Sequence, residues 1–145
     1  MRAMIYLYES PLGTISYDWS DVICQGLWLH AQDTASETHD DPISRWLASY
    51  FNRSPAILPP LAEAATPFQQ KMRDGLWMIP AGEVRTYGEI ARTLQTSPRA
   101  IGQALGANPL PLLVPCHRII AADGLGGFSS DLEWKKKLLR FERGF

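Results

Sequence analysis

The chain has 145 residues, of which 46% are hydrophobic and 20% are charged. This balance is that of an ordinary globular protein and argues against a disordered or fibrous one. No apolar run has membrane-spanning length, and we expect no secretion signal because residues 1–4 lead directly into strand-like sequence. Residues 1–65 carry a formal charge of −5 and residues 66–145 one of +4, which weakly favours a polyanionic partner for the second half.

The first thirty residues predict a β-meander, and one helix follows it. Hydrophobic residues alternate before and after the turn-like sequence at 10–13, which indicates two strands, and a turn at 20–21 leads into a third strand over 22–29. Asp41 and Pro42 then offer an N-cap and an N1 proline. Hydrophobic residues recur at helical spacing from there through 51, the stripe of an amphipathic helix.

Residues 52–65 contain three prolines and therefore predict a linker rather than a long helix. We expect two domains, one over residues 1–60 with the β-meander and helix, and one over residues 66–145.

The second domain contains four helix starts. Capping sequences predict them at Thr66–Gln69, Thr86–Glu89, Ser97–Pro98 and Ser130–Glu133. In the last helix we expect Leu132, Leu138 and Leu139 to face inward. The two middle helices are short and joined by a three-residue turn, the outline of a helix-turn-helix. The predicted fold class is therefore α+β, with a small β-rich N-terminal domain and a helical, winged-helix-like C-terminal domain.

The second helix of this pair has an unusual outward face. If Ile101 and Leu105 face the core, the opposite side carries Arg99, two glycines at 102 and 106, and Gln103. A helix that reads bases from the major groove needs several long hydrogen-bonding side chains. This face suits close approach to a sugar-phosphate backbone or a narrow groove, although the glycines could equally allow tight packing on a neighbouring helix.

An apolar, proline-stiffened run over 108–115 ends abruptly at Cys116, His117 and Arg118. The thiolate is the nucleophilic form of cysteine, and a nearby imidazole and positive charge both favour it. Neighbours in sequence can point to opposite faces of a strand, so this tripeptide alone is a weak signal. Arg118 is interpreted as structural.

The other cysteine has different surroundings. Cys24 lies in a hydrophobic strand and is interpreted as an inert core thiol. One disulfide to Cys116 is possible in principle, but two reduced thiols in an intracellular chain are favoured. The cysteines and histidines have no ligand-pair spacing, so no metal site is predicted.

Several motifs that occur in a fixed order connect these observations to one protein family. Residues 66–145 resemble the catalytic domain of the O6-alkylguanine-DNA alkyltransferases, also called methylated-DNA–protein-cysteine methyltransferases. The resemblance depends on Thr66–Gln69, on IPAGEVRTYGEIA from Ile79, on RAIGQALGANP from Arg99 and on PCHRII from Pro115. The N-terminal segment resembles the family's small β-rich domain more loosely and is shorter.

The resemblance implies direct repair of O6-alkylguanine, and with it O4-alkylthymine as a further substrate. The protein would bind duplex DNA from the minor groove, flip the damaged base out and take its alkyl group irreversibly onto Cys116, once per molecule. His117 would activate the thiol through a water molecule, Glu142 would orient His117, and Asn108 would brace the helix-turn-helix against the active-site turn. The DNA-binding set it implies is Tyr87, Arg99, Ala100, Gly102, Gln103 and Gly106, with Arg99 as the finger that fills the vacated space and Tyr87 rotating a phosphate. The implied substrate pocket is Pro111, Val114, Phe128 and Ser129.

The loop after the active site departs from the family pattern. Phe128 stands where the family has a tyrosine, Ser130 and Asp131 replace two glycines, and the loop is one residue shorter. Phe128 keeps an apolar wall for a flipped base but has no hydroxyl to donate to the leaving group. The departure bears on rate and on the preferred alkyl group rather than on the reaction class.

Three other interpretations are weighed against this one. An alkyltransferase-like protein would bind alkylated DNA without turnover, but such proteins replace the reactive cysteine. A winged-helix DNA-binding regulator would need a recognition helix rich in long side chains. A cysteine hydrolase would need an oxyanion hole that the sequence does not indicate. The resemblance implies no cofactor, double-stranded DNA as partner, no membrane, a monomer, and a cytoplasmic location at the nucleoid or in the nucleus.

Overall fold

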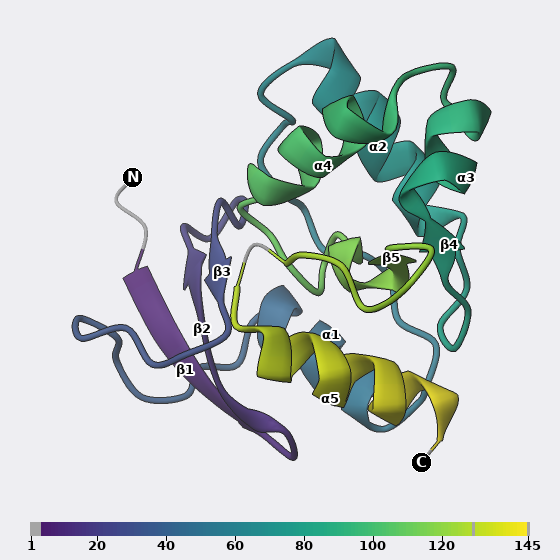
Figure 1. Ribbon diagram of the computed structural model, residues 1–145. Helices are drawn as coiled ribbons and strands as arrows, with labels where there is room; N and C mark the ends of the chain where they lie inside the picture. Colours follow the sequence, from purple (N-terminus) through teal and green to yellow (C-terminus); the bar gives the residue numbers. More distant parts are fainter. Residues whose placement is uncertain (1–3, 129, 145) are drawn as a thin grey trace. The chain divides into compact units, whose positions relative to one another are not determined.

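The computed structural model describes residues 4–128 and 130–144 (Figure 1). The chain forms two compact units that divide between Ala62 and Glu63. The first unit contains a three-stranded antiparallel sheet and one helix, and the second is mainly helical. The predicted α+β class is correct. Among the described residues, no helix is both long and apolar enough to cross a membrane.

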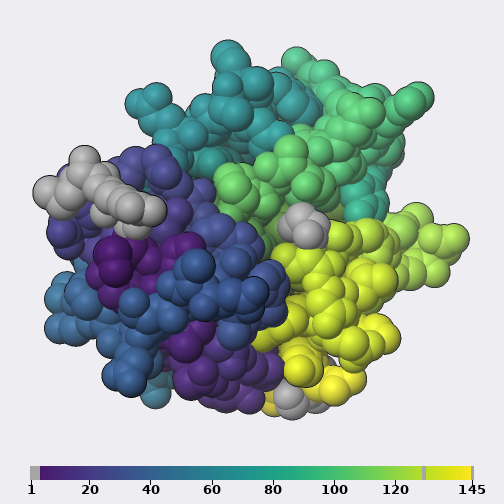
Figure 2. Space-filling model, turned by 90° about the vertical axis from the view of Figure 1, so that its left-hand side faces the viewer, coloured from purple at the N-terminus to yellow at the C-terminus, as the bar shows by residue number. Residues whose placement is uncertain are grey.

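The sheet of the first unit has the order β1-β2-β3, as a meander requires. Strand β1 (Met4–Ser10) pairs with β2 (Gly13–Trp19) along its whole length, and each of its seven residues is partly or fully exposed. Atoms of this part of the chain, in purple, are visible on the surface (Figure 2). The inner strand β2 contributes the fully buried Ile15 and Tyr17 to the core. Strand β3 (Leu27–Trp28) is much shorter than the prediction of 22–29, because Cys24 pairs with Leu61 instead of with β2.

Helix α1 (Pro42–Phe51) begins where the sequence predicts. The side chain of Asp41 accepts hydrogen bonds from the backbone N–H groups of Ile43 and Ser44, which otherwise lack partners at a helix start. Asp41 also accepts the hydroxyl of Tyr17 at 2.6 Å. The cap thereby joins the helix to the central strand of its own unit.

The second unit contains α2 (Pro67–Trp77), α3 (Tyr87–Thr93), α4 (Pro98–Gly106), a 3₁₀ turn η1 (Cys116–Arg118) and α5 (Leu132–Arg143). Helices α3 and α4 pack against each other in the predicted helix-turn-helix order, with Gln95 in the left-handed region (φ 56°) of the turn between them. Ile101 and Leu105 of α4 are buried, as predicted.

A short parallel pairing places the helix-turn-helix beside the 3₁₀ turn. Strand β4 (Arg85–Thr86) pairs with β5 (Ile119–Ile120). Because β4 runs directly into α3 and β5 directly follows η1, Tyr87 and the Cys116 turn are brought to neighbouring positions although almost thirty residues separate them in sequence.

Two of the predicted capping boxes differ from the prediction in the structure. Thr66 accepts the N–H of Gln69, but the Gln69 side chain donates to the carbonyl of Ala104 on α4 rather than returning to the cap. At α5 the cap is Asp131, one residue later than predicted. Leu132 is therefore the first residue of α5.

The buried residues of α5 differ in part from those predicted. The prediction that Leu132 faces inward is wrong, since Leu132 is 45% exposed, whereas Leu138 and Leu139 are buried as expected. Trp134 and Lys135 are buried with them. A lysine therefore occupies a core position of the last helix.

Candidate active site

The candidate nucleophile opens onto a small pocket in the second unit. Cys116 is the first residue of η1 and is only 3% exposed. The pocket has a volume of about 220 Å³. Its lining consists of Tyr87, Gly102, Leu105, Gly106, Cys116, Gly127 and Phe128. One buried thiol therefore meets an apolar pocket that is walled by both helix-turn-helix helices and the loop after β5.

The backbone before Cys116 is bent by Pro115. With φ −78° and ψ 63°, Pro115 is the centre of an inverse γ-turn, in which the N–H of Cys116 donates to the carbonyl of Val114 at 2.7 Å. The same carbonyl accepts the side-chain amide of Asn108 at 3.2 Å, and Asn108 in turn accepts the N–H of Leu110. Asn108 lies just beyond the end of α4, so its side chain fixes the nucleophile's turn to the helix-turn-helix.

His117 points away from solvent toward the last helix. It is fully buried, and its Nε2 lies 2.8 Å from Oε2 of Glu142. Because a carboxylate only accepts, this contact places the imidazole proton on Nε2 and leaves the lone pair on Nδ1. Nδ1 is buried and has no hydrogen-bond partner among the described residues. Burial lowers the pKa of His117 below its ordinary value, against the opposing effect of Glu142, so the ring is neutral and Nδ1 is a free base.

Glu142 is shared between His117 and Arg118. Arg118 donates to both oxygens of Glu142, at 2.9 and 2.8 Å, and to the carbonyl of Ile79 at 2.8 Å. Burial alone would raise the pKa of Glu142, but the hydrogen bonds from His117 and Arg118 outweigh it and hold the pKa well below its usual range. Arg118 therefore keeps Glu142 ionised while Glu142 holds His117.

Tyr87 forms one wall of the pocket. Its hydroxyl accepts the N–H of Gly127 at 3.2 Å. Gly126 has φ 75°, and a Cβ at this position would lie 2.9 Å from the Tyr87 ring. A glycine is required here both by the backbone conformation and by the close approach of the tyrosine.

The predicted DNA-binding residues divide into two groups. Arg99 and Gln103 are exposed on α4, and Ala100 is at its N-terminus, where its N–H is capped by Ser97. Gly102 and Gly106 instead line the pocket. Missing side chains on this face of α4 therefore open the way to Cys116.

Two predicted pocket residues are placed elsewhere. Pro111 and Val114 are buried and pair with each other, because Leu112 adopts φ 77° and folds the apolar run into a tight turn. Neither lines the pocket. Phe128 does, and Ser129 lies outside the described residues.

The sequence reasoning missed Leu105, Gly127 and Lys135. Leu105 is interpreted only as a core residue, yet it lines the pocket. Lys135 is fully buried and donates to the carbonyls of Ile119 and Gly127, at 2.7 Å each. The helical spacing could have indicated that Lys135 is buried, since it lies three and four residues before the buried Leu138 and Leu139.

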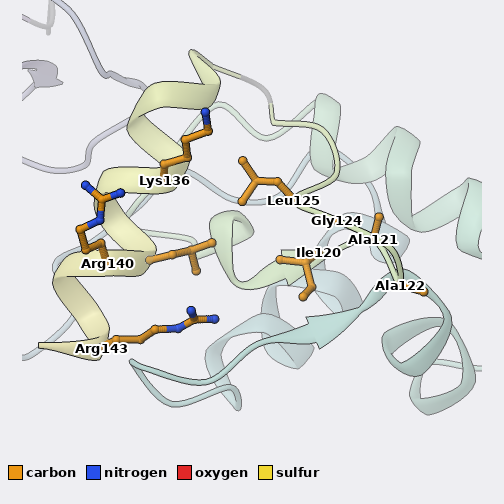
Figure 3. Close-up of a pocket in the computed structure, with 9 residues that line it drawn as sticks. Ile120, Ala121, Ala122, Gly124, Leu125, Lys136, Arg140 and Arg143 are labelled. Carbon is orange, nitrogen blue, oxygen red and sulfur yellow. The ribbon is translucent and has the colours of Figure 1, made fainter. Parts of the chain in front are cut away.

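A larger pocket lies between α5 and the segment that contains β5 and the loop after it (Figure 3). Its volume is about 490 Å³, and basic residues of α5 face apolar residues of β5 and the loop across it. Among its lining residues in the described part of the chain there is no cysteine, histidine or carboxylate. We therefore assign the chemistry to the smaller pocket, which contains Cys116.

Neither cysteine is in a disulfide, and no group of three or more His, Cys, Asp or Glu residues that could hold a metal occurs in residues 4–128 and 130–144. Cys24 is fully buried, its Sγ donates to the carbonyl of Gly26, and burial raises its pKa well above the ordinary value. It is a core thiol in the first unit.

Known protein sequences match both units. The family model described as 6-O-methylguanine DNA methyltransferase, DNA binding domain, matches residues 67–144. The methylated-DNA–protein-cysteine methyltransferase of Sulfolobus acidocaldarius is 39% identical over 143 residues, which cover 94% of this chain and 90% of that protein. The protein of the same name from Saccharolobus solfataricus is 38% identical, over 94% of this chain and 93% of its own length.

Solved structures give the same result. Mycobacterium tuberculosis OGT in complex with DNA superposes with a TM-score of 0.81 at 29% identity, covering 97% of this chain and 93% of that chain. The O6-methylguanine-DNA methyltransferase of the archaeon Pyrococcus kodakaraensis strain KOD1 has a TM-score of 0.78 at 28% identity, over 96% and 99%.

Proposed function

Since the chain belongs to the methylated-DNA–protein-cysteine methyltransferase family, whose members repair alkylated guanine by transferring the alkyl group to a cysteine, we propose that Cys116 is the acceptor. The chain is an enzyme of this class. The observation that carries the assignment is that Cys116 lines a pocket and is followed by a buried histidine held by a carboxylate, whereas Cys24 is a fully buried core thiol. Residues 66–145 then form the DNA-binding and alkyl-acceptor domain.

Activation of the thiol uses His117. Its Nδ1 carries a lone pair in a site from which solvent is largely excluded, and a single water molecule can carry the thiol proton to it. Glu142 accepts Nε2–H and stabilises the imidazolium that forms. Asn108 holds the turn that aims Sγ, through the carbonyl of Val114.

The transfer itself is an in-line displacement at the alkyl carbon. The thiolate forms an S–C bond while the C–O6 bond of the damaged guanine breaks, and the electron pair of that bond remains on the base. The base takes up a proton and leaves as guanine. The thioether is chemically stable, so each molecule acts once, and the balance needs no cofactor.

Access to the alkyl carbon requires that the base leave the duplex. We propose that α4 approaches double-stranded DNA with Arg99, Ala100 and Gln103, and that Arg99 fills the space left in the stack. Gly102 and Gly106 leave the entrance to the pocket open, while Tyr87 at the start of α3 acts on the adjacent phosphate. The enzyme would work as a monomer in the cytoplasm, at the nucleoid or in the nucleus, where its substrate is.

The test is to mix the protein with duplex DNA that contains one O6-methylguanine. We expect the intact mass to increase by one methyl group, with the label in the peptide that contains Cys116, and a second addition of DNA to have no effect. A parallel reaction with DNA that contains O4-methylthymine shows whether this base is also a substrate. Unmodified protein that still bound the damaged DNA would instead indicate damage recognition without transfer.

A further inference from the structure

Lys135 has no role in the mechanism above, yet it is fully buried. Buried ammonium groups are costly and are ordinarily paired with a carboxylate. Here the ammonium has two carbonyl partners, Ile119 and Gly127, and it forms no ion pair within the part of the chain that the structure describes. Glu142, the buried acid of the same helix, is engaged by His117 and Arg118.

The two carbonyls belong to two different segments of the active site. Ile119 begins β5, directly after the turn that starts with Cys116, and Gly127 is part of the pocket wall. One cation therefore joins the segment that carries the thiol to the loop that faces it. Carbonyl oxygens satisfy the donors of the ammonium but do not neutralise its charge.

A count of the charges around Lys135 shows what could neutralise it. Arg118 and Glu142 cancel each other, and His117 is neutral. While Cys116 is a thiol, the site has one uncompensated positive charge, and ionisation of Cys116 removes it. Burial lowers the pKa of Lys135 to about 8, and the interaction with Cys116 opposes this decrease.

We propose that Lys135 is a positioning residue for alkyl transfer, whose charge stabilises the thiolate of Cys116 and whose bond to Gly127 holds the pocket wall beside it. The proposal rests on the assignment of Cys116 as the acceptor. The same charge opposes protonation of His117, so Lys135 favours the state in which the Cys116–His117 pair has lost a proton.

The first test follows benzylation of Cys116 by the free base O6-benzylguanine as a function of pH, which avoids any effect on DNA binding. Lys135→Met removes the charge but keeps the length of the side chain. We expect the midpoint of the rate profile to move up by about one pH unit, so that the rate at neutral pH falls roughly tenfold. Lys135→Arg keeps the charge and should keep the midpoint of the unchanged protein. Lys136→Met removes the same charge from an exposed neighbouring residue, and it should change neither the midpoint nor the rate at neutral pH.

The ultraviolet absorbance of the thiolate, with that of Cys116→Ser subtracted, should show the same displacement without any substrate. If Lys135→Met lowered only the maximal rate and left both midpoints unchanged, Lys135 would merely anchor the loop and the electrostatic part of the proposal would be wrong.

A second measurement needs no substitution at Lys135 and therefore does not depend on how such a variant folds. The ε-carbon resonance of Lys135 is titrated before and after methylation of Cys116. A thiolate partner raises the pKa of the ammonium, so methylation should lower it. An unchanged value would overturn the proposal. If the unsubstituted protein were not alkylated on Cys116 at all, the proposed acceptor would be wrong instead, and the two failures are thus distinguishable.

Discussion

Each compact unit of the protein contains one buried cysteine that is not in a disulfide, and the two thiols have opposite surroundings. Cys24 is 0% exposed and Cys116 is 3% exposed. Around Cys24, burial together with Asp18 raises the pKa of the thiol. Around Cys116 there are a neutral histidine with a free nitrogen, a lysine and an open pocket. Burial alone therefore says nothing about reactivity, whereas the charges that are buried with the thiol decide it.

The most direct way to break this comparison is to remove each thiol in turn. Cys116→Ser should abolish methyl transfer completely, because an alcohol is a far weaker nucleophile at neutral pH. Cys24→Ser should still accept one methyl group per molecule. Intact mass after incubation with O6-methylguanine DNA measures both. A methyl group found on Cys24 in the first variant would show that the two sites are not distinct.

The buried carboxylates of the two units provide a second comparison. Glu142→Gln should slow benzylation by the free base about 100-fold, since His117 loses the group that fixes its tautomer, and should lower the free energy of unfolding by about 3 kcal/mol because Arg118 loses its partner. Asp41→Asn removes a carboxylate that also contacts a histidine, but one that caps α1.

Asp41→Asn should cost about 1–2 kcal/mol of stability and leave the rate per folded molecule unchanged. Urea unfolding and single-turnover rates separate the two effects. Equal rates in the two variants would mean that Glu142 is only structural.

The same residues make the stability of the second unit depend on pH. The pKa values of His117 and Glu142 are both lower in the folded protein than their ordinary values, so acid protonates the unfolded chain first. The contribution of these two groups to the unfolding free energy should be fully present above pH about 6.5, decrease below it as His117 is protonated on unfolding, and decrease again below about 4.3 because of Glu142. Urea unfolding at several pH values measures this. In Glu142→Gln the second decrease should be smaller, and a stability that rose from pH 7 to pH 5 would contradict the expectation.

Arg99 separates recognition on the surface from chemistry in the pocket. Arg99→Ala should slow repair of duplex DNA about tenfold, because an extrahelical base is no longer replaced in the stack. Reaction with free O6-benzylguanine should change less than about twofold, since Arg99 does not line the pocket. Arg140→Ala, which removes an exposed arginine of α5, is the matched control. Equal losses with both substrates would exclude a role in base flipping.

The smallest effect concerns Phe128. Phe128→Tyr adds a hydroxyl that can donate to the leaving oxygen, and one such hydrogen bond contributes about 0.5–1.5 kcal/mol, or a rate increase of roughly twofold to tenfold. Phe128→Leu keeps an apolar wall without a hydroxyl and should give no increase. Single-turnover rates with the free base decide between them. A slower tyrosine variant would mean that the pocket is closed by the added oxygen.

Local patterns predict most of the fold, and non-local pairing accounts for the errors. The caps at Asp41, Thr86 and Ser97 lie where the sequence predicts them, because each depends on two or three neighbouring residues. The length of β3 could not be predicted in this way, since it is set by the pairing of Cys24 with Leu61.

The site follows the same division. Cys116 and His117 can be identified as candidates from their neighbours in the sequence. The role of Glu142 was implied only by the family resemblance, because 25 residues separate it from His117. Pro111 and Val114 belong by composition to an apolar wall, but the left-handed conformation of Leu112 turns them inward. Lys135 was missed because a lysine is expected to be outside.

The contacts that surround Cys116 close long loops of chain. His117 reaches Glu142 over 25 residues, Arg118 reaches Ile79 over 39, and Gly127 reaches Tyr87 over 40. Closing such loops costs conformational entropy before any contact compensates for it, so we expect these contacts to form late in folding. During synthesis, a chain that has emerged only as far as η1 already contains the thiol but lacks Lys135 and Glu142. The nucleophile is thus assembled last, and an incomplete or misfolded molecule holds an ordinary cysteine.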